Sequence, residues 1–337
     1  MKIGLIGAGR IGKLHGEVLT YRIPETEIKT VAEIYAETVK DWVKQLRIPN
    51  LTTDYAEVLN DPEIEAVLIC SSTDTHAHLI VEAAGAGKHI FCEKPIDFDI
   101  GRINEALDAV NAAGVKLQIG FNRRFDHNFK KVRDVVATGG VGDVHIVRIT
   151  SRDPAPPPLE YVKVSGGLFL DMTIHDFDMA RYLSMSEVEE VYAQGAVLVD
   201  PAIGQAGDVD TAIVTLKFEN GALGVIDNSR QAVYGYDQRV EVFGTNGCVA
   251  VENDLPNSAR ISTADGVLGE KPLYFFLERY QDSYIEEIKA FVGAVRSDEP
   301  PPVTGNDGLQ PVLIGLAALK SCRENRPVKI EEIAGSA

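Results

Sequence analysis

The stretch KIGLIGAGRIG, residues 2–12, decides the fold of the first part of this chain. Residues 2–6 form a short apolar run that is typical of a buried parallel strand, and a helix-like segment from Ile11 to about Tyr21 follows. Three glycines with the spacing G-x-G-x-x-G stand between them: Gly7, Gly9 and Gly12. Strand, glycine turn and helix therefore occur in the order that the dinucleotide-binding fingerprint requires.

Each position of this motif has an expected task. Gly7 permits the tight turn, Gly9 lets the backbone approach a pyrophosphate, and Gly12 lets the helix pack against the strand. The pyrophosphate would lie at the helix N-terminus, where free N–H groups and the helix dipole favour an anion. Arg10 and Ile11 lie inside the motif, and we expect them to contact the cofactor as well.

An acidic residue ends the second expected strand, residues 28–33. Glu33 follows Gly12 by 21 residues, close to the roughly 20 at which a carboxylate accepts hydrogen bonds from the adenosine ribose. A carboxylate there would repel a 2′-phosphate, which favours NAD over NADP. Glu33 could instead be a solvated strand-end residue, and Arg10 could help to accommodate NADP.

Strands and helices continue to alternate up to residue 121. We expect helices at 37–47, 75–87 and 99–113 and a short helical segment at 54–62, with strands at 65–70, 89–93 and 116–121. This pattern predicts a doubly wound parallel sheet, in which ligands bind outside the carboxyl ends of the strands. The polar residues expected on that edge are Ser71, Ser72, Thr73, His76, Glu93, Lys94 and Asn122, and all but Asn122 are expected cofactor contacts.

Lys94 follows Glu93 and precedes Pro95 at this edge. An ammonium group there could hydrogen-bond a substrate hydroxyl or help to move its proton. The other interpretation is an exposed lysine before a turn.

The densest polar cluster is SGGLFLDMTIHDFDMARYL, residues 165–183, whose apolar spacing is helical. Asp171 and His175 are i and i+4, so they would share one helix face. A histidine can accept the proton that leaves a hydroxyl during hydride transfer, and a carboxylate can orient the imidazolium. Asp171 could instead be a helix cap and His175 a core histidine, or both could bind a metal together with Asp178.

Beta-like runs dominate after residue 122, at 144–151, 188–199, 211–218, 222–231 and 239–252. Glycine-containing turns at 219–221 and 245–247 are hairpin signals, and helices are expected at 277–296 and 307–323. The predicted fold class is α/β, with an N-terminal Rossmann domain (1–121) and a C-terminal α+β domain (122–337) built on a mostly antiparallel open sheet. An uncovered sheet face is a natural surface for oligomer formation.

The composition of the chain disfavours several classes of partner and location. The net charge of −17 disfavours nucleic acid as a partner, and no stretch has the ~18 uninterrupted apolar residues of a membrane span. The start of the chain lacks the order of a secretory signal. The four cysteines lack the spacing of a zinc or disulfide set, so reduced thiols in a cytoplasmic protein are expected, with no metal.

These residues together resemble the Gfo/Idh/MocA oxidoreductase family over nearly the whole length. The motif Glu93-Lys94-Pro95 is far more specific to that family than the glycine motif, and GGLFLDMTIHDFDMARYL with GFNRRFD (120–126) resembles its inositol 2-dehydrogenase branch. The resemblance implies that Lys94, Asp171 and His175 form the catalytic group. It also implies that the substrate pocket is lined by Arg123, Asp153, Asp171, His175 and Tyr236.

The reaction implied by the resemblance is the NAD-dependent oxidation of myo-inositol to 2-keto-myo-inositol by a cytoplasmic homotetramer. Scyllo-inositol, chiro-inositol and glucose are alternative substrates. Two other classes stay open at this point: a regulator that binds NAD(H) without catalysis, and a metal-dependent hydro-lyase that uses Asp171, His175 and Asp178.

Overall fold

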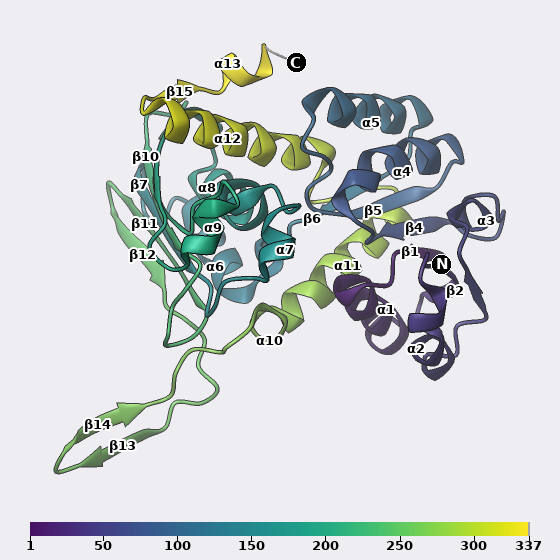
Figure 1. The fold of residues 1–337 in the computed structure, drawn as a ribbon, viewed down its shortest axis with the longest axis horizontal. Helices are drawn as coiled ribbons and strands as arrows, with labels where there is room; N and C mark the ends of the chain where they lie inside the picture. Colours follow the sequence, from purple (N-terminus) through teal and green to yellow (C-terminus); the bar gives the residue numbers. More distant parts are fainter. Residues whose placement is uncertain (336–337) are drawn as a thin grey trace. The chain divides into compact units, whose positions relative to one another are not determined.

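The computed structural model describes residues 1–335 and divides into two compact units (Figure 1). The first unit contains residues 1–122 and 282–310, and the second contains residues 123–281 and the chain from Pro311 onward. Each unit has its own main sheet.

Six parallel strands form the sheet of the first unit, in the order β3-β2-β1-β4-β5-β6. They are β1 (Lys2–Ile6), β2 (Glu27–Ala32), β3 (Asn50–Thr52), β4 (Ala66–Ile69), β5 (His89–Glu93) and β6 (Leu117–Gly120). This strand order is that of the dinucleotide-binding fold, so the predicted Rossmann sheet is confirmed. The sequence pattern did not reveal β3, because a strand of three residues is too short to have a period.

Helices connect these strands. They are α1 (Arg10–Arg22), α2 (Lys40–Gln45), α3 (Tyr55–Leu59), α4 (Thr73–Gly85) and α5 (Ile100–Ala113), with a 3₁₀ turn at Ala36–Thr38. A sixth helix, α11 (Gln281–Ser297), comes from much later in the chain. Its buried residues Ile285, Ile288 and Phe291 belong to the same core cluster as Ile3 and Leu5. Residues 282–310 were expected in the C-terminal domain, and they group with the first unit because of this apolar packing.

Seven strands form the sheet of the second unit, in the order β12-β11-β7-β10-β9-β8-β15. They are β7 (Val144–Arg152), β8 (Val188–Ala196), β9 (Thr211–Phe218), β10 (Leu223–Ser229), β11 (Asp237–Gly244), β12 (Gly247–Val251) and β15 (Val328–Lys329). Only β7 and β10 pair in parallel, so the mostly antiparallel sheet is confirmed. The two expected hairpins join β9 to β10 and β11 to β12.

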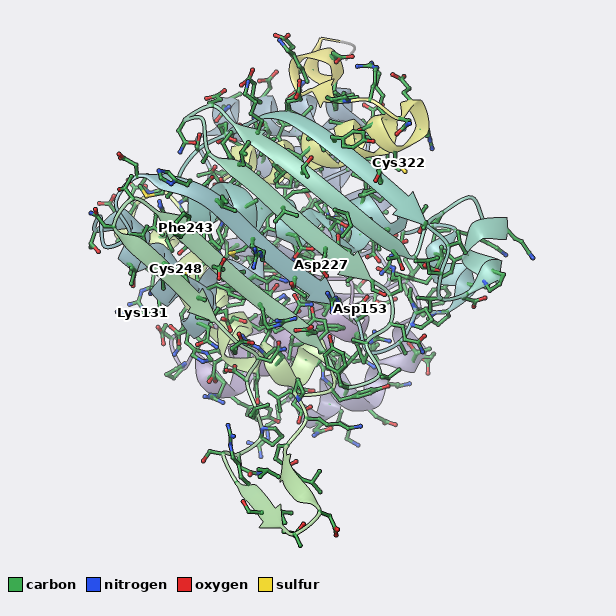
Figure 2. The ribbon with its side chains drawn as sticks, turned by 90° about the vertical axis from the view of Figure 1, so that its left-hand side faces the viewer. Lys131, Asp153, Asp227, Phe243, Cys248 and Cys322 are labelled. Carbon is green, nitrogen blue, oxygen red and sulfur yellow. The ribbon has the colours of Figure 1, made fainter. Side chains whose placement is uncertain are left out.

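Helices α6 (His127–Ala137) and α8 (Ile174–Ser184) pack against this sheet. Along β9 every second residue is buried, whereas Ile213 and Lys217 on the opposite side are exposed. Figure 2 looks onto this sheet, with Asp227, Phe243 and Cys248 labelled. The alternation leaves one face of the sheet uncovered in the single chain.

Short elements complete the described chain. They are a 3₁₀ turn (Asn122–Phe125), α7 (Leu159–Val162), a π-helical turn (Leu168–Met172), α9 (Pro201–Gln205), the hairpin β13 (Arg260–Thr263) and β14 (Gly266–Gly269), α10 (Phe276–Arg279), α12 (Gly305–Glu324) and α13 (Glu331–Ala334). Within residues 1–335, the helices lack the combination of length and apolarity that crossing a membrane requires.

Candidate active site

The glycine turn between β1 and α1 has the geometry that the motif predicts. Gly7 has φ +88°, a region that side chains rarely adopt. A Cβ on Gly12 would lie 2.1 Å from the Gly7 carbonyl oxygen, so the helix approaches the turn as closely as glycine allows. No acidic residue stands in the first turn of α1 and no side chain caps it, which leaves its N–H groups suited to an anion.

Glu33 lies directly beside this turn. Its carboxylate accepts hydrogen bonds from the backbone N–H groups of Ala8, at 2.7 Å, and Tyr35, at 3.0 Å. These two contacts hold the carboxylate at the end of β2, next to the site suited to the pyrophosphate. The residues present therefore fit NAD, because an acid fixed at this point is placed for the ribose hydroxyls.

The loop after β4 contacts the same turn. A Cβ on Gly7 would lie 2.5 Å from the Ser71 backbone nitrogen, and the Ser71 hydroxyl lies 2.6 Å from that of Thr75. Ser72 and Thr73 begin α4. The sequence therefore placed Ser71, Ser72 and Thr73 correctly at the carboxyl end of β4.

His76 is buried below this edge. Its Nδ1 lies 2.8 Å from the carbonyl oxygen of Pro95, and its Nε2 lies 3.0 Å from that of Ser71. The ring thereby ties the loop after β4 to the loop after β5. This position favours a supporting role for His76 over the direct cofactor contact that we expected.

Glu93 ends β5 opposite Gly120 of β6, and Lys94 follows it. The Glu93 carboxylate lies 2.7 Å from Nε2 of His15, a residue of α1 that the sequence analysis did not single out. Lys94 is partly buried. Both residues therefore stand at the ligand-bearing edge that the topology predicts.

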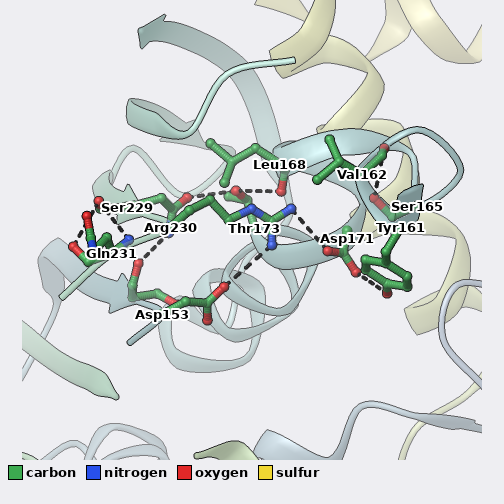
Figure 3. A network of polar contacts seen from close by, with 12 residues as sticks. Asp153, Tyr161, Val162, Ser165, Leu168, Asp171, Thr173, Ser229, Arg230 and Gln231 are labelled. Atoms are coloured by element: carbon green, nitrogen blue, oxygen red, sulfur yellow. Dashed lines mark hydrogen bonds and ion pairs between the residues drawn. The ribbon is translucent and has the colours of Figure 1, made fainter. Parts of the chain in front are cut away.

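In the second unit, Asp171 is held by two neighbours (Figure 3). Arg230 Nη2 donates to Asp171 Oδ2 at 3.0 Å, and the Tyr161 hydroxyl donates to Oδ1 at 2.9 Å. Nη1 of the same guanidinium lies 3.4 Å from Asp153 Oδ2. One buried arginine thus joins the two predicted pocket acids.

Asp171 and His175 do not belong to one continuous α-helix. Asp171 lies in the π-helical turn that precedes α8, whereas His175 is the second residue of α8. The i, i+4 spacing therefore does not by itself fix how the two side chains face each other. Such π turns are frequent at functional sites.

Asp178 forms an ion pair with Arg124. Its two carboxylate oxygens accept hydrogen bonds from Arg124 at 2.6 to 3.1 Å, in a bidentate pair. Since this pair uses both oxygens, Asp178 is poorly suited to complete the metal set with Asp171 and His175.

Arg123 and Tyr236, two further predicted pocket residues, contact each other and are both buried. Arg123 Nη1 donates to Asp176 at 2.6 Å, and Nη2 lies 3.3 Å from the Tyr236 hydroxyl. Asn228 donates to the second oxygen of Asp176 at 2.8 Å. These contacts form a buried polar network that fixes both predicted pocket side chains.

Burial shifts the acidity of several of these groups. It raises the pKa of Asp153 to about 6, although the Arg230 charge opposes this shift. Burial also raises the pKa of Asp176 against the opposing charge of Arg123, and it raises that of Tyr236 well above its ordinary value. Asp153 is therefore a carboxyl group that titrates near neutrality.

Sequence reasoning missed Arg230, Tyr161 and Asp176. Arg230 follows β10, and Tyr161 lies in a short helix after a proline-rich loop, so no local motif marks either residue. The sequence feature that could have indicated Arg230 is its position, because Arg230 and Asp153 both lie near the ends of expected strands in the second domain.

Comparisons with known proteins agree with this geometry. The model of an oxidoreductase family, NAD-binding Rossmann fold, matches residues 1–121, and that of the GFO/IDH/MocA C-terminal domain matches residues 129–250. An uncharacterized oxidoreductase of Bacillus subtilis is 56% identical over 97% of this chain and 96% of its own length. A myo-inositol 2-dehydrogenase of Thermotoga maritima is 51% identical over 99% of this chain and 100% of its own.

A solved structure is also similar. The scyllo-inositol dehydrogenase of Lactobacillus casei with bound NAD(H) and scyllo-inositol has a TM-score of 0.92 and 29% identity. The match covers 98% of this chain and 99% of that one.

Proposed function

The chain belongs to the GFO/IDH/MocA oxidoreductase family, and we propose that it oxidises myo-inositol to 2-keto-myo-inositol (scyllo-inosose) with NAD as the cofactor. This would be the first step of inositol breakdown. The observation that carries the proposal is the Asp171 carboxylate, fixed by Arg230 and Tyr161 directly ahead of the helix that bears His175.

His175 accepts the proton of the reacting hydroxyl in this proposal, because imidazole is the side chain most often used as a general base at neutral pH. Asp171 orients the substrate or the base, and its ion pair with Arg230 holds the carboxylate in place. Lys94 holds the reacting hydroxyl and contacts the nicotinamide end of the cofactor. The roles of these three residues follow from the family resemblance.

The remaining pocket residues would recognise the polyol. Asp153 offers carboxylate oxygens to ring hydroxyls, and its pairing with Arg230 keeps it in place. Arg123 and Tyr236 would line the same pocket, and their hydrogen bonds to Asp176 and to each other hold them in place. A pocket of charged groups suits a substrate with a hydroxyl on every carbon.

The first unit would bind NAD, which supplies the hydride acceptor when bound. The first turn of α1 receives the pyrophosphate together with Gly9, Arg10 and Ile11. Glu33 accepts hydrogen bonds from the adenosine ribose, and the same carboxylate disfavours a 2′-phosphate. We propose residues 1–121 as the cofactor-binding domain and residues 122–337, apart from the packing of α11, as the substrate and assembly domain.

Scyllo-inositol is the strongest alternative substrate, because the similar Lactobacillus casei enzyme binds it. Chiro-inositol and glucose are further alternatives within the same chemistry. The alternative from another class is a regulator that binds NAD(H) without catalysis. Such a regulator would not need the fixed arrangement of Asp171, Arg230 and Tyr161.

The uncovered face of the second sheet supports a homotetramer. Its exposed apolar residues are Ile146, Ile213, Leu223 and Phe243. They stand among ion pairs such as that of Arg152 with Asp227, at 2.6 Å. An apolar face with a polar surround is typical of an assembly surface, and light scattering of Ile213→Glu beside the parent chain tests this assignment.

We assign the protein to the cytoplasm. The structure contains four free cysteines, and thiols of this kind persist in a reducing compartment. Cell fractionation with an antibody against the chain tests the assignment.

The test of function is NADH formation by purified protein with NAD and myo-inositol, in parallel with scyllo-inositol, chiro-inositol and glucose. A kcat/KM for myo-inositol above that for the other three supports the proposal. A clear preference for another polyol would change the substrate but keep the reaction class. NADH binding without turnover of any polyol would favour the regulator.

A further inference from the structure

His15 is a fully buried histidine that lies beside the carboxyl end of β5 in the first unit. It lies in α1, and its Nε2 is 2.7 Å from Oε1 of Glu93, the residue before Lys94. Phe91 and Tyr284 contact the imidazole edge to face, with ring centroids 5.1 and 5.8 Å away. The ring is therefore fixed by packing, and the contact with Glu93 is its polar link to the edge of the sheet.

A second acid stands behind this pair. Glu287 of α11 is fully buried, with Oε1 3.9 Å from Nε2 of His15, too far for a hydrogen bond. Burial, and next the charge of Glu93, raise the pKa of Glu287 well above its ordinary value. Burial therefore disfavours the charged form of Glu287, and Glu93 is the acid within hydrogen-bond distance of the imidazole.

Gly120 of the neighbouring strand also borders the Glu93 carboxylate. A Cβ at position 120 would lie 3.0 Å from both Cδ and Oε2 of Glu93, so any larger residue would press on the carboxylate. His15 is within hydrogen-bond distance of the carboxylate, and Gly120 leaves room for it. The side chain of Glu93 remains 14% exposed, so it is open to the ligand-bearing edge.

We propose that His15 is a positioning residue for cofactor binding: it holds the Glu93 carboxylate, and with it the start of the segment Glu93-Lys94-Pro95, in the orientation that the nicotinamide half of NAD requires. This inference rests on the proposed use of NAD. It does not depend on which polyol is oxidised.

The physical reason is the position of Glu93 at the carboxyl end of a parallel strand, where ligands of this fold bind. A carboxylate there can turn freely unless a donor fixes it, and a hydrogen bond between charged or polar partners restricts it strongly. His15 supplies that donor from a helix that begins at the glycine turn. The two ends of the cofactor site are thereby linked through α1.

The test compares two substitutions at one position. His15→Gln keeps an N–H donor near the place of Nε2, whereas His15→Leu removes it at similar volume. We expect His15→Leu to weaken NADH binding, measured by fluorescence titration, by about 10-fold or more, and His15→Gln to restore it to within about threefold. The KM for NAD should follow the NADH dissociation constant, and the KM for the polyol should change less.

A second substitution reaches Glu93 without touching His15. Gly120→Ala adds one methyl group at the carboxylate, and NADH binding should weaken in the same direction while the melting temperature stays close to that of the parent. His89→Gln is the matched control, because His89 begins the same strand, at the end remote from Glu93. Its effect on NADH binding should be within about twofold.

The outcomes separate the possibilities. If His15→Leu and His15→Gln lower the melting temperature equally and leave NADH affinity unchanged, His15 is only structural and the proposal is wrong. Unchanged affinity in Gly120→Ala would also count against it, and it remains informative if His15→Leu fails to fold. A parent chain that binds NADH but oxidises no polyol would refute the proposed function while leaving this test intact.

Discussion

Arg230→Met removes the charge that joins the two pocket acids while keeping a long side chain. Arg230 is 3% exposed, and its guanidinium lies 3.0 Å from Asp171 and 3.4 Å from Asp153. A single guanidinium thus pairs with both acids. The substitution should therefore affect stability, turnover and pH dependence together.

The structure sets the expected magnitude. Removing one partner of a buried ion pair costs about 3–5 kcal/mol, because the remaining charge stays desolvated. The side chains of Asp153 and Asp171 are 23% and 12% exposed, so water relieves part of this cost and we expect about 3 kcal/mol. Loss of a charged hydrogen bond to Asp171 should lower kcat/KM for the polyol by about 10–100-fold.

The pH dependence of kcat/KM should shift in a direction that the structure predicts. Asp153 has a pKa of about 6 with Arg230 present, and the Arg230 charge lowers that value. Removing the charge favours the protonated acid, so the pKa of Asp153 must rise further. Since the carboxylate form would bind the polyol, kcat/KM should increase with pH through about 6 in the parent chain. In Arg230→Met this limb should move to higher pH.

Steady-state kinetics across pH, with urea unfolding followed by circular dichroism, measure all three effects. Arg102→Met is the matched control, because Arg102 lies outside the second sheet, is 63% exposed at the side chain and is 3.6 Å from Asp97. It should cost at most about 1 kcal/mol and leave the kinetics unchanged. A pH limb that stays in place in Arg230→Met, with normal kcat/KM, would refute this account of the pocket.

Three further predictions concern single residues. Asp153→Asn should flatten the pH limb near 6 in polyol kinetics. The same substitution should remove the pH dependence that Asp153 gives to the free energy of unfolding. A carboxyl group whose pKa is raised on folding stabilises the folded state most below its unfolded pKa near 3.8, and this contribution is lost as pH rises through about 6. If the unfolding midpoints of the two chains are equal at pH 4 and at pH 7, this account is contradicted. Lys94→Ala and His175→Ala should each lower kcat by about 10²–10⁴-fold with a much smaller change in NADH affinity, and near-normal turnover of His175→Ala would exclude it as the base. Glu33→Ser should weaken NAD and reduce the preference over NADP, measured as the ratio of the two kcat/KM values; an unchanged ratio would remove Glu33 from cofactor selection.

Local patterns predicted much of the first unit. The apolar run at residues 3–6, the glycine spacing and Glu33 are short-range features, and each has one backbone geometry that suits it. The structure confirms their arrangement, with Gly7 at φ +88° and the Glu33 carboxylate on the N–H of Ala8. The hairpins of the second sheet were predictable for the same reason, because glycine turns act over a few residues.

Local sequence patterns could not predict which residues pair with the pocket acids Asp153 and Asp171. Arg230 meets Asp153 and Asp171 across sequence separations of 77 and 59 residues, and nothing in the neighbouring sequence marks these contacts. The π-helical turn at Asp171 also escaped the helical spacing, because its apolar residues fit an α-helix equally well. The same holds for α11, whose amphipathic pattern does not say which core it joins.

The sequence by itself therefore determined the two-part α/β architecture and the dinucleotide turn, and it predicted which residues would transfer a proton. Only the tertiary structure decided that His15 holds Glu93, that Arg230 pairs with both pocket acids, and that Asp178 is committed to Arg124. The physical reason is the distance along the chain over which each kind of interaction acts. Backbone conformation follows from neighbours within a few residues, whereas the charge state and orientation of a buried side chain depend on whatever distant segments the packing brings against it.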